Sequence, residues 1–135
     1  MSLKGLKVLI VEDELLILEL FEFTLKLHDA EVRTARSVNE AMKLLESWFP
    51  EIIVTDIGLP EKDGYTFIRG LRTNPEMRTL PIIALSGYVS ITDPIENDEF
   101  LMKLGKPVDP DYLIKILAEK SKRSTAEIKN PLKLE

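Results

Sequence analysis

Five residues with charged or hydroxyl side chains follow short apolar runs of the chain. Three of them are carboxylates, one carries a hydroxyl and one carries an ammonium group. Two unit charges about 4 Å apart repel by roughly 4 kcal/mol at an effective dielectric near 20. Three carboxylates in one place therefore need a cation among them, and their oxygens are hard ligands of the kind that Mg²⁺ prefers. The five residues are Glu12, Asp13, Asp56, Ser86 and Lys106.

This set of side chains suits phosphoryl transfer, because a carboxylate can attack phosphorus as a covalent nucleophile. A metal ion and Lys106 would neutralise oxygens of the transferred group, and Ser86 would donate a hydrogen bond to them. We expect Asp56 to be the nucleophile, because it ends a central strand and precedes the turn Gly58-Leu59-Pro60. Each residue alone has an ordinary interpretation, such as a charge at a helix N-terminus for an acidic pair. Their joint placement at strand ends is what indicates a site.

Strand and helix patterns alternate five times along the chain. The first helix is predicted from apolar residues at i, i+4, i+7 and i+11, namely Leu16, Leu20, Phe23 and Leu27. The second begins at a capping box, in which Ser37 caps and Glu40 reaches back. The expected strands cover residues 7–11, 31–35, 52–55, 81–85 and 100–104. The expected helices cover residues 15–27, 38–49 and 65–72, a short or irregular segment within 90–99, and the residues from 110 onward.

This alternation predicts an α/β fold, with a parallel sheet covered by helices on both faces and joined by right-handed crossovers. In such sheets the ligand site lies at the carboxyl ends of the strands, where the strand order reverses. The five candidate residues would therefore meet along one rim of the sheet.

Length and composition exclude several other classes of protein. The chain has 135 residues, which is one domain at roughly 150 residues per domain. It has no cysteine and one histidine, His28, which excludes disulfides, thiolate zinc sites and multi-histidine metal sites. A net charge of −5 gives no general attraction to nucleic acid or an anionic membrane. No apolar run approaches the roughly 20 residues of a membrane span, and no signal peptide is recognisable, so we expect a cytoplasmic protein.

Several runs of the chain, in this order, resemble the receiver domain of two-component response regulators. The resemblance extends from Lys4 to about Lys122, and we expect residues 1–122 to form the receiver domain and 123–135 a tail or linker. It implies a flavodoxin-like, doubly wound sheet of five parallel strands in the order 2-1-3-4-5. The matching runs are Val8 to Glu14, Ile52 to Pro60 with Asp63-Gly64, Ile82 to Gly87, and Lys106 to Pro110.

The resemblance also implies a metal site and a phosphoacceptor. Asp13, Asp56 and the backbone carbonyl of Gly58 would bind Mg²⁺, with Glu12 assisting through water. Asp56 would accept a phosphoryl group from a histidine kinase or a histidine phosphotransfer protein. The domain would catalyse only its own phosphorylation and dephosphorylation, so it would be a switch rather than a metabolic enzyme.

Ser86 and Lys106 would hold the phosphoryl oxygens. The structural change caused by phosphorylation would then alter the binding of an output partner protein or domain. The surface around Tyr88, residues 90–99 and Tyr112 would respond to it. The last helix face is a candidate surface for a partner or for a homodimer, although core packing explains its apolar residues equally well.

The segment after Ser86 departs from the family pattern. The slot three residues before the expected lysine is usually aromatic, and here it is Lys103. A second alignment would make Phe100 the aromatic residue and Lys103 the site lysine. We prefer Lys106, because Pro107-Val108-Asp109-Pro110 follows it in the family manner, and we expect a cis bond between Lys106 and Pro107.

Three alternative functions can be compared with this interpretation. An aspartate-nucleophile Mg²⁺ phosphatase would need a second aspartate two residues after Asp56, where this chain has Gly58. A flavodoxin-like cofactor module would need a phosphate-binding loop after the first strand, where Glu12-Asp13-Glu14 would repel phosphate unless a metal intervened. A receiver that is never phosphorylated and serves only for docking remains open.

Overall fold

The computed structural model describes residues 2–58, 64–87 and 102–121. Five parallel strands form one sheet in the order β2-β1-β3-β4-β5, as the family resemblance predicts. The strands are β1 (Lys7–Val11), β2 (Glu31–Ala35), β3 (Ile52–Asp56), β4 (Ile82–Ser86) and β5 (Met102–Gly105). The helices in the described residues are α1 (Leu15–Leu27), α2 (Val38–Leu45), α3 (Gly64–Arg72) and α4 (Pro110–Lys120). The doubly wound α/β fold is thus confirmed.

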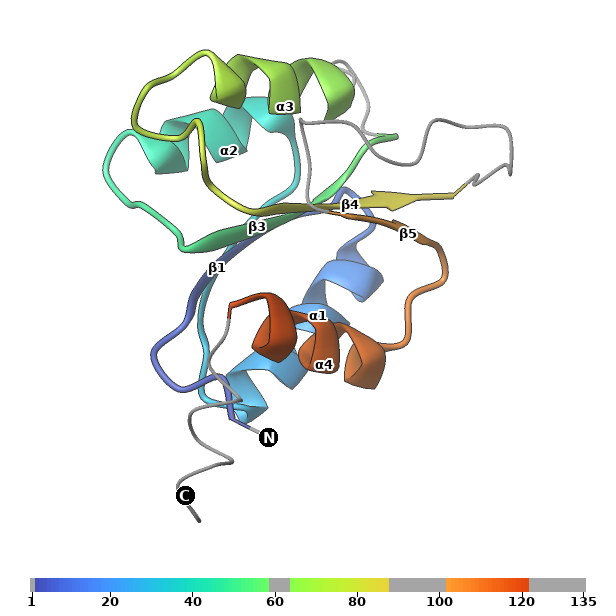
Figure 1. Ribbon diagram of the computed structural model, residues 1–135. Coiled ribbons are helices and arrows are strands. Elements are labelled where there is room, and N and C mark those ends of the chain that lie inside the picture. The colour runs from blue at the N-terminus through green and yellow to red at the C-terminus, as the bar shows by residue number, and fades with distance from the viewer. Residues whose placement is uncertain (1, 59–63, 88–101, 122–135) are drawn as a thin grey trace.

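Helices cover both faces of the sheet. α1 and α4 lie on one face, and α2 and α3 lie on the other (Figure 1). The side chains of β1 alternate between the two layers: Val8 and Ile10 pack toward α1 and α4, whereas Leu9 and Val11 pack toward α2 and α3. A strand buried on both faces must be apolar at successive positions, which explains the unbroken apolar run that predicted it.

The ends of several elements follow the predicted signals. Ser37 Oγ accepts a hydrogen bond from the Glu40 backbone N–H at 3.1 Å, and Glu40 Oε1 accepts one from the Arg36 N–H at 2.8 Å. α4 begins at Pro110, and the side chain of Asp109 accepts a hydrogen bond from the Asp111 N–H at 3.0 Å. The bonds to Ser37 and Asp109 satisfy backbone donors that the first helical turn leaves without partners, whereas Glu40 binds the N–H of the residue just before the cap.

The predicted end of α2 is wrong, and several strand ends differ from the expected ones by a single residue. α2 ends at Leu45 rather than near Phe49; the chain turns after it and buries Trp48 against the sheet. β5 extends one residue beyond its expected end, to Gly105, where it pairs with Ser86, and its expected first residues 100 and 101 lie outside the described residues. The short helix expected within 90–99 lies outside the described residues, as do Asp63 of the matching run and the tail 123–135. No helix in the described part of the chain is long and apolar enough to cross a membrane.

α1 is apolar on two sides. Leu18, Phe21 and Leu25 are buried in the layer between α1 and the sheet. The stripe that predicted the helix, Leu16, Leu20, Phe23 and Leu27, is exposed instead. The stripe therefore locates the helix correctly but does not mark the face that packs in the core.

Gly64 lies at a close approach between the start of α3 and the end of β3. Its N–H donates to the Ile57 carbonyl at 3.1 Å. A Cβ at this position would overlap the backbone of Ile57 and would lie 2.7 Å from the Asp56 carbonyl oxygen. The residue must therefore be glycine for α3 to begin this close to the strand.

We predict that Gly64→Ala lowers the free energy of unfolding by about 1–3 kcal/mol, because the backbone must shift to admit the methyl group. Gly70→Ala in the same helix is the matched control, since a Cβ there meets nothing within 4 Å. It should stabilise the protein by about 0.5–1 kcal/mol through helix propensity. Urea unfolding monitored by circular dichroism measures both. Equal effects of the two substitutions would contradict the close approach.

Candidate functional site

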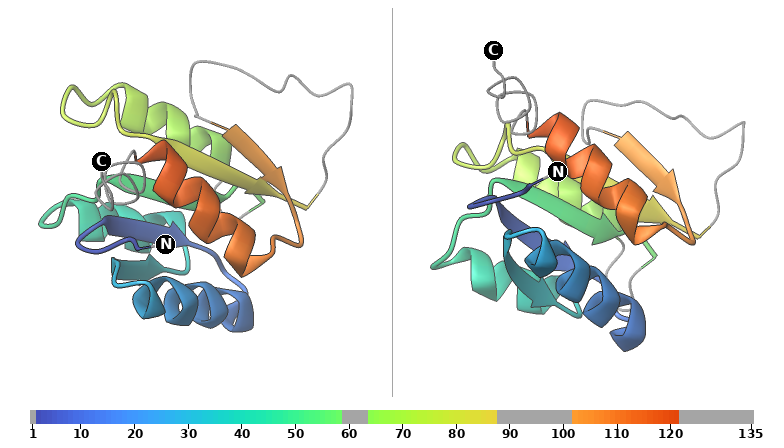
Figure 2. Two further views of the ribbon diagram at one scale, coloured as in Figure 1. Left: turned by 60° about the horizontal axis from the view of Figure 1, so that its bottom comes forward. Right: turned by 90° about the horizontal axis from the view of Figure 1, so that it is seen from below.

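The sheet register brings the predicted site residues to one edge. In the pairing of β1 with β3, Val11 lies beside Thr55, so Glu12 follows β1 close to where Asp56 ends β3. Asp56 lies beside Leu85, and Ser86 lies beside Gly105, directly before Lys106. Because all five strands are parallel, these ends lie along the same rim, where the arrowheads point in Figure 2.

Three carboxylates meet at this rim. One oxygen from each of Glu12, Asp13 and Asp56 lies within 4.8 Å of the others. Glu12 is fully buried, Asp56 is 5% exposed and Asp13 is half-buried. Such a concentration of negative charge is unfavourable without a compensating cation.

The Lys106 ammonium lies between two of these carboxylates. Its Nζ is 3.0 Å from Glu12 Oε1 and 3.0 Å from Asp56 Oδ2. Burial alone would lower the pKa of Lys106, but its hydrogen bonds and charge interactions with Asp56 and Glu12 outweigh burial and raise it. Lys106 is therefore a fixed positive charge at the site.

Burial is the main influence on Glu12 and raises the pKa of its carboxyl group. The negative charge of Asp56 raises this pKa further. The backbone N–H of Glu14, which donates to Glu12 Oε2 at 3.0 Å, and the Lys106 ammonium act in the opposite direction. The net rise shows that the site holds Glu12 in a place where its charge is costly.

Lys103, the other candidate lysine, points elsewhere. Its Nζ donates to the Tyr65 hydroxyl at 3.1 Å and lies 5.8 Å from the centre of the Tyr65 ring. In β5 it pairs with Ala84, two positions before the strand end. The structure thus brings Lys106, and not Lys103, to the carboxylates. The expected cis bond between Lys106 and Pro107 is present.

Ser86 and Gly58 complete the rim. Ser86 is buried at the end of β4, and its carbonyl accepts a hydrogen bond from the Lys106 N–H at 2.8 Å. The Gly58 N–H donates to Asp56 Oδ1 at 2.9 Å, so the loop after β3 lies directly against that carboxylate. Tyr88 of the expected responding surface and Phe100 of the alternative alignment lie outside the described residues.

The residues present fit a Mg²⁺ ion. Three carboxylates supply hard oxygen ligands and an excess of negative charge, and half-buried Asp13 leaves one side open for water ligands. A thiolate or imidazole ligand, which would favour zinc, is absent from the described part of this cluster.

One further contact supports the site and could not be inferred from the sequence. The Arg36 guanidinium donates to the Asp13 carbonyl at 3.0 Å and so connects the loop after β2 to the loop that carries two of the carboxylates. Arg36 is 23 residues from Asp13 and stands in no motif, so only the folded chain brings the two together.

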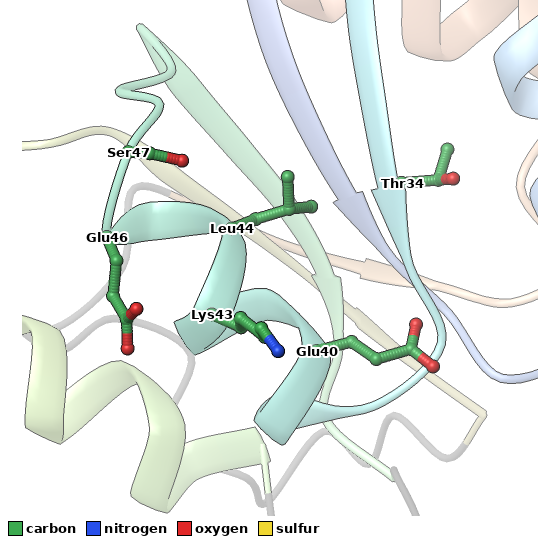
Figure 3. Close-up of a pocket in the computed structure, with 6 residues that line it drawn as sticks. All are labelled: Thr34, Glu40, Lys43, Leu44, Glu46 and Ser47. Atoms are coloured by element: carbon green, nitrogen blue, oxygen red, sulfur yellow. The ribbon is translucent and has the colours of Figure 1, made fainter.

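A surface hollow lies apart from these residues. It is formed by α2 and the turn after it, together with one side chain of β2 (Figure 3). None of the predicted site residues lines it. Its lining residues are Thr34, Glu40, Lys43, Leu44, Glu46 and Ser47.

Known sequences match most of the chain. The family model of the response regulator receiver domain matches residues 8–118. An uncharacterized 14.6 kDa protein from Leptolyngbya boryana is 35% identical over 120 residues, which cover 87% of this chain and 92% of that protein. A probable transcriptional regulator ycf27 from Cyanophora paradoxa is 28% identical over 93% of this chain, and the match spans only 53% of the longer protein.

Solved structures of response regulators have the same fold as this chain. The chemotaxis response regulator CheY4 of Vibrio cholerae superposes with a TM-score of 0.76 at 27% identity, over 86% of this chain and 98% of that one. The receiver domain of the Francisella response regulator 1452 gives a TM-score of 0.80 at 26% identity, over 89% and 99% of the two chains. With the family model matching residues 8–118, the chain belongs to the response regulator receiver domain family and is a signalling domain of two-component systems.

Proposed function

We propose that this receiver accepts a phosphoryl group on Asp56 in a Mg²⁺-dependent reaction. The donor is a phosphohistidine of a histidine kinase or a histidine phosphotransfer protein. The observation that carries the proposal is the cluster of Glu12, Asp13 and Asp56 with the Lys106 ammonium at 3.0 Å from two of them.

The transfer exchanges one bond to phosphorus for another. An Asp56 carboxylate oxygen forms the new O–P bond, the N–P bond of the donor breaks, and the imidazole nitrogen keeps the electron pair and takes up a proton from solvent. A bound Mg²⁺ would neutralise negative charge on the phosphoryl oxygens. Asp13, Asp56 and the Gly58 carbonyl are the proposed ligands, with Glu12 assisting through water.

Lys106 and Ser86 act on the transferred group. Lys106 Nζ is already 3.0 Å from Asp56 Oδ2, so a small movement places it on a phosphoryl oxygen. The Ser86 hydroxyl stands at the end of the neighbouring strand and would donate a charge-assisted hydrogen bond to another. These contacts stabilise charge on the phosphoryl group and, after transfer, report its presence to β4 and β5.

The phosphorylated domain would then bind an output partner, either a separate protein or a further domain. The phosphoryl group adds a charge of about −1.5 to −2 at Asp56. A receiver that only docks without being phosphorylated would use the same fold, and the phosphorylation experiment separates these two functions.

Asp56→Asn should abolish phosphorylation and keep the fold, because an amide is a poor nucleophile of nearly the same shape. Intact-mass spectrometry after treatment with a small acyl phosphate and Mg²⁺ measures the added group. Asp111→Asn is the matched control, since Asp111 is exposed on α4. An unmodified wild-type protein would favour the docking function, and phosphate retained on the Asp56→Asn variant would refute Asp56 as the acceptor.

Lys106→Met should slow phosphorylation by about 10²-fold, as does removal of other transition-state donors. Lys103→Met is the control and should leave the rate within about threefold, a change of less than 1 kcal/mol in the barrier. Rates of phosphate incorporation are compared at a temperature where circular dichroism shows both variants folded. A slow Lys103→Met variant with a normal Lys106→Met variant would reverse the assignment of the two lysines.

Asp13→Asn should raise the metal-free melting temperature and weaken the response to Mg²⁺. Removing one of three neighbouring negative charges relieves about 1 kcal/mol or less, because Asp13 is half-buried and screened. That corresponds to a rise of about 2–4 °C. In the wild type, Mg²⁺ at about 100 times its dissociation constant should add about 2.7 kcal/mol of stability.

Differential scanning fluorimetry with and without Mg²⁺ measures both effects. The control Glu119→Gln removes one exposed negative charge on α4, far along the chain from Asp13. It should change neither the metal-free melting temperature nor the response to Mg²⁺. A metal-free melting temperature below wild type for Asp13→Asn would contradict the repulsion argument.

A further inference from the structure

The outer side of α1 carries a stripe of large apolar side chains. Leu16 is 81% exposed, Leu20 49%, Phe23 64% and Leu27 64%. Leu15 of α1 is also exposed but lies outside the stripe, and the other large exposed apolar side chains of the described residues are Met42 and Phe49, which line one hollow, and Tyr112 on α4. Scattered apolar residues on a surface are ordinary, whereas a continuous patch marks an interaction surface.

The spacing of the stripe is that of a coiled-coil seam. The intervals between its four members are 4, 3 and 4 residues, which is the alternation of a and d positions over two heptads. The core-facing residues Leu18, Phe21 and Leu25 lie at other heptad positions, so the fold does not use the seam. α1 lies at the outside of its layer, beside α4 and the edge strand β2 (Figure 2). The seam is thus a helix-pairing surface with no partner among the described residues.

We propose that the seam, Leu16, Leu20, Phe23 and Leu27, pairs antiparallel with the α1 seam of a second copy of this chain. An antiparallel arrangement places Leu16 of each copy against Leu27 of the other and Leu20 against Phe23 of the other. The four resulting residue pairs are related by a two-fold axis at the middle of the paired helices, which gives a closed dimer. Every seam residue then has an apolar partner.

The charges beside the seam favour this arrangement over a parallel one. Glu19 and Lys26 precede the a-position residues Leu20 and Leu27, so both occupy g positions. In an antiparallel pair, g positions face g positions, which brings Glu19 of each copy beside Lys26 of the other. In a parallel pair, Glu19 would face Thr24, an uncharged residue. The antiparallel dimer therefore gains two symmetric ion pairs that a parallel dimer lacks.

Lys26 is available to form an ion pair with Glu19 of the second copy. It forms an ion pair with Glu22 of its own helix at 2.8 Å, and the Lys26 side chain is 54% exposed. An exposed pair of this kind contributes little to stability, so Lys26 can turn to a second acidic group without a large loss.

The last helix is a weaker candidate for self-association. Its apolar residues Leu113 and Ile116 are buried in the core, and Tyr112 is the one large exposed apolar side chain of α4. The two-heptad seam of α1 offers four such side chains in one line. A seam of this length still makes a small interface, so the dimer belongs to the weak, transient class.

Analytical ultracentrifugation of the full chain tests the dimer over a concentration range up to about 1 mM, where a dissociation constant corresponds to about 4 kcal/mol of binding. Wild type should show a reversible monomer–dimer equilibrium. Phe23→Gln should weaken it by about tenfold or more, because each dimer loses two buried rings. Phe49→Gln removes a similarly exposed ring outside α1 and should have no effect. Circular dichroism should show wild-type helix content in both variants.

A charge exchange identifies the orientation. Glu19→Lys and Lys26→Glu should each weaken the dimer by about tenfold, since each turns two attractive pairs into repulsive ones. An equimolar mixture of the two variants should restore association, because each then supplies the charge that the other lacks. These measurements need neither Mg²⁺ nor phosphorylation, so they are independent of the proposed phosphoacceptor function.

A wild-type protein that stays monomeric up to about 1 mM would overturn the proposal, and its seam would then belong to a helix of another protein. Equal weakening by Phe49→Gln and Phe23→Gln would place the interface elsewhere. A mixture of the charge variants that fails to associate would exclude the antiparallel pairing.

Discussion

The ammonium of Lys106 between two buried carboxylates is the interaction on which the rest of the site depends. Glu12 is fully buried, and an ionised carboxylate in such a place is unfavourable unless a cation lies close. Lys106 supplies one positive charge at 3.0 Å from Glu12 and from Asp56, against three carboxylates. The protein alone therefore leaves the cluster negative, and a divalent cation would bring it to neutrality. A phosphoryl group added to Asp56 would restore negative charge beside Lys106, which is why the same lysine suits both states.

The sheet provides the positions that this charge balance requires. Lys106 reaches the carboxylates because β5 pairs with β4 so that Ser86 lies beside Gly105, and the Lys106 N–H donates to the Ser86 carbonyl. The hydroxyl and the ammonium are therefore carried by neighbouring backbone segments joined by a hydrogen bond. A displacement of Ser86 toward a phosphoryl group would act directly on the backbone at the start of the loop into α4. Gly64 adds a second constraint, since its missing side chain lets α3 begin against the backbone that carries Asp56.

The sequence predicts the parallel sheet and its rim from the alternation of strands and helices, because the carboxyl ends of parallel strands lie along one edge, whereas the strand order follows only from the resemblance to receiver domains. It predicts less where one pattern admits two placements. Lys103 and Lys106 both lie near the end of the last apolar run, and the residues after Lys106 only favour it as the site lysine. The pairing of Lys103 with Ala84 shows that Lys103 is still inside the strand, where it contacts Tyr65. In α1, both 16-20-23-27 and 18-21-25 follow the helical period. Periodicity cannot distinguish two stripes on one helix, because the choice depends on how β1, β2 and α4 surround it.

α1 packs against the sheet with its inner face and exposes the seam on its outer face, and its N-terminus lies close to the acidic cluster. Its inner face holds the helix against the sheet, and its outer seam is free of any role in the core. The helix starts two residues after Asp13, so whatever covers Leu16 also stands close to the open side of the acidic cluster. In the antiparallel dimer, the C-terminal end of one α1 would lie beside the N-terminal end of the other, next to its carboxylates. The phosphohistidine donor of the proposed function would have to approach the same rim to reach Asp56. Self-association through α1 and binding of the donor would then compete for neighbouring surfaces. A higher receiver concentration, which favours the dimer, would reduce access of the donor to Asp56.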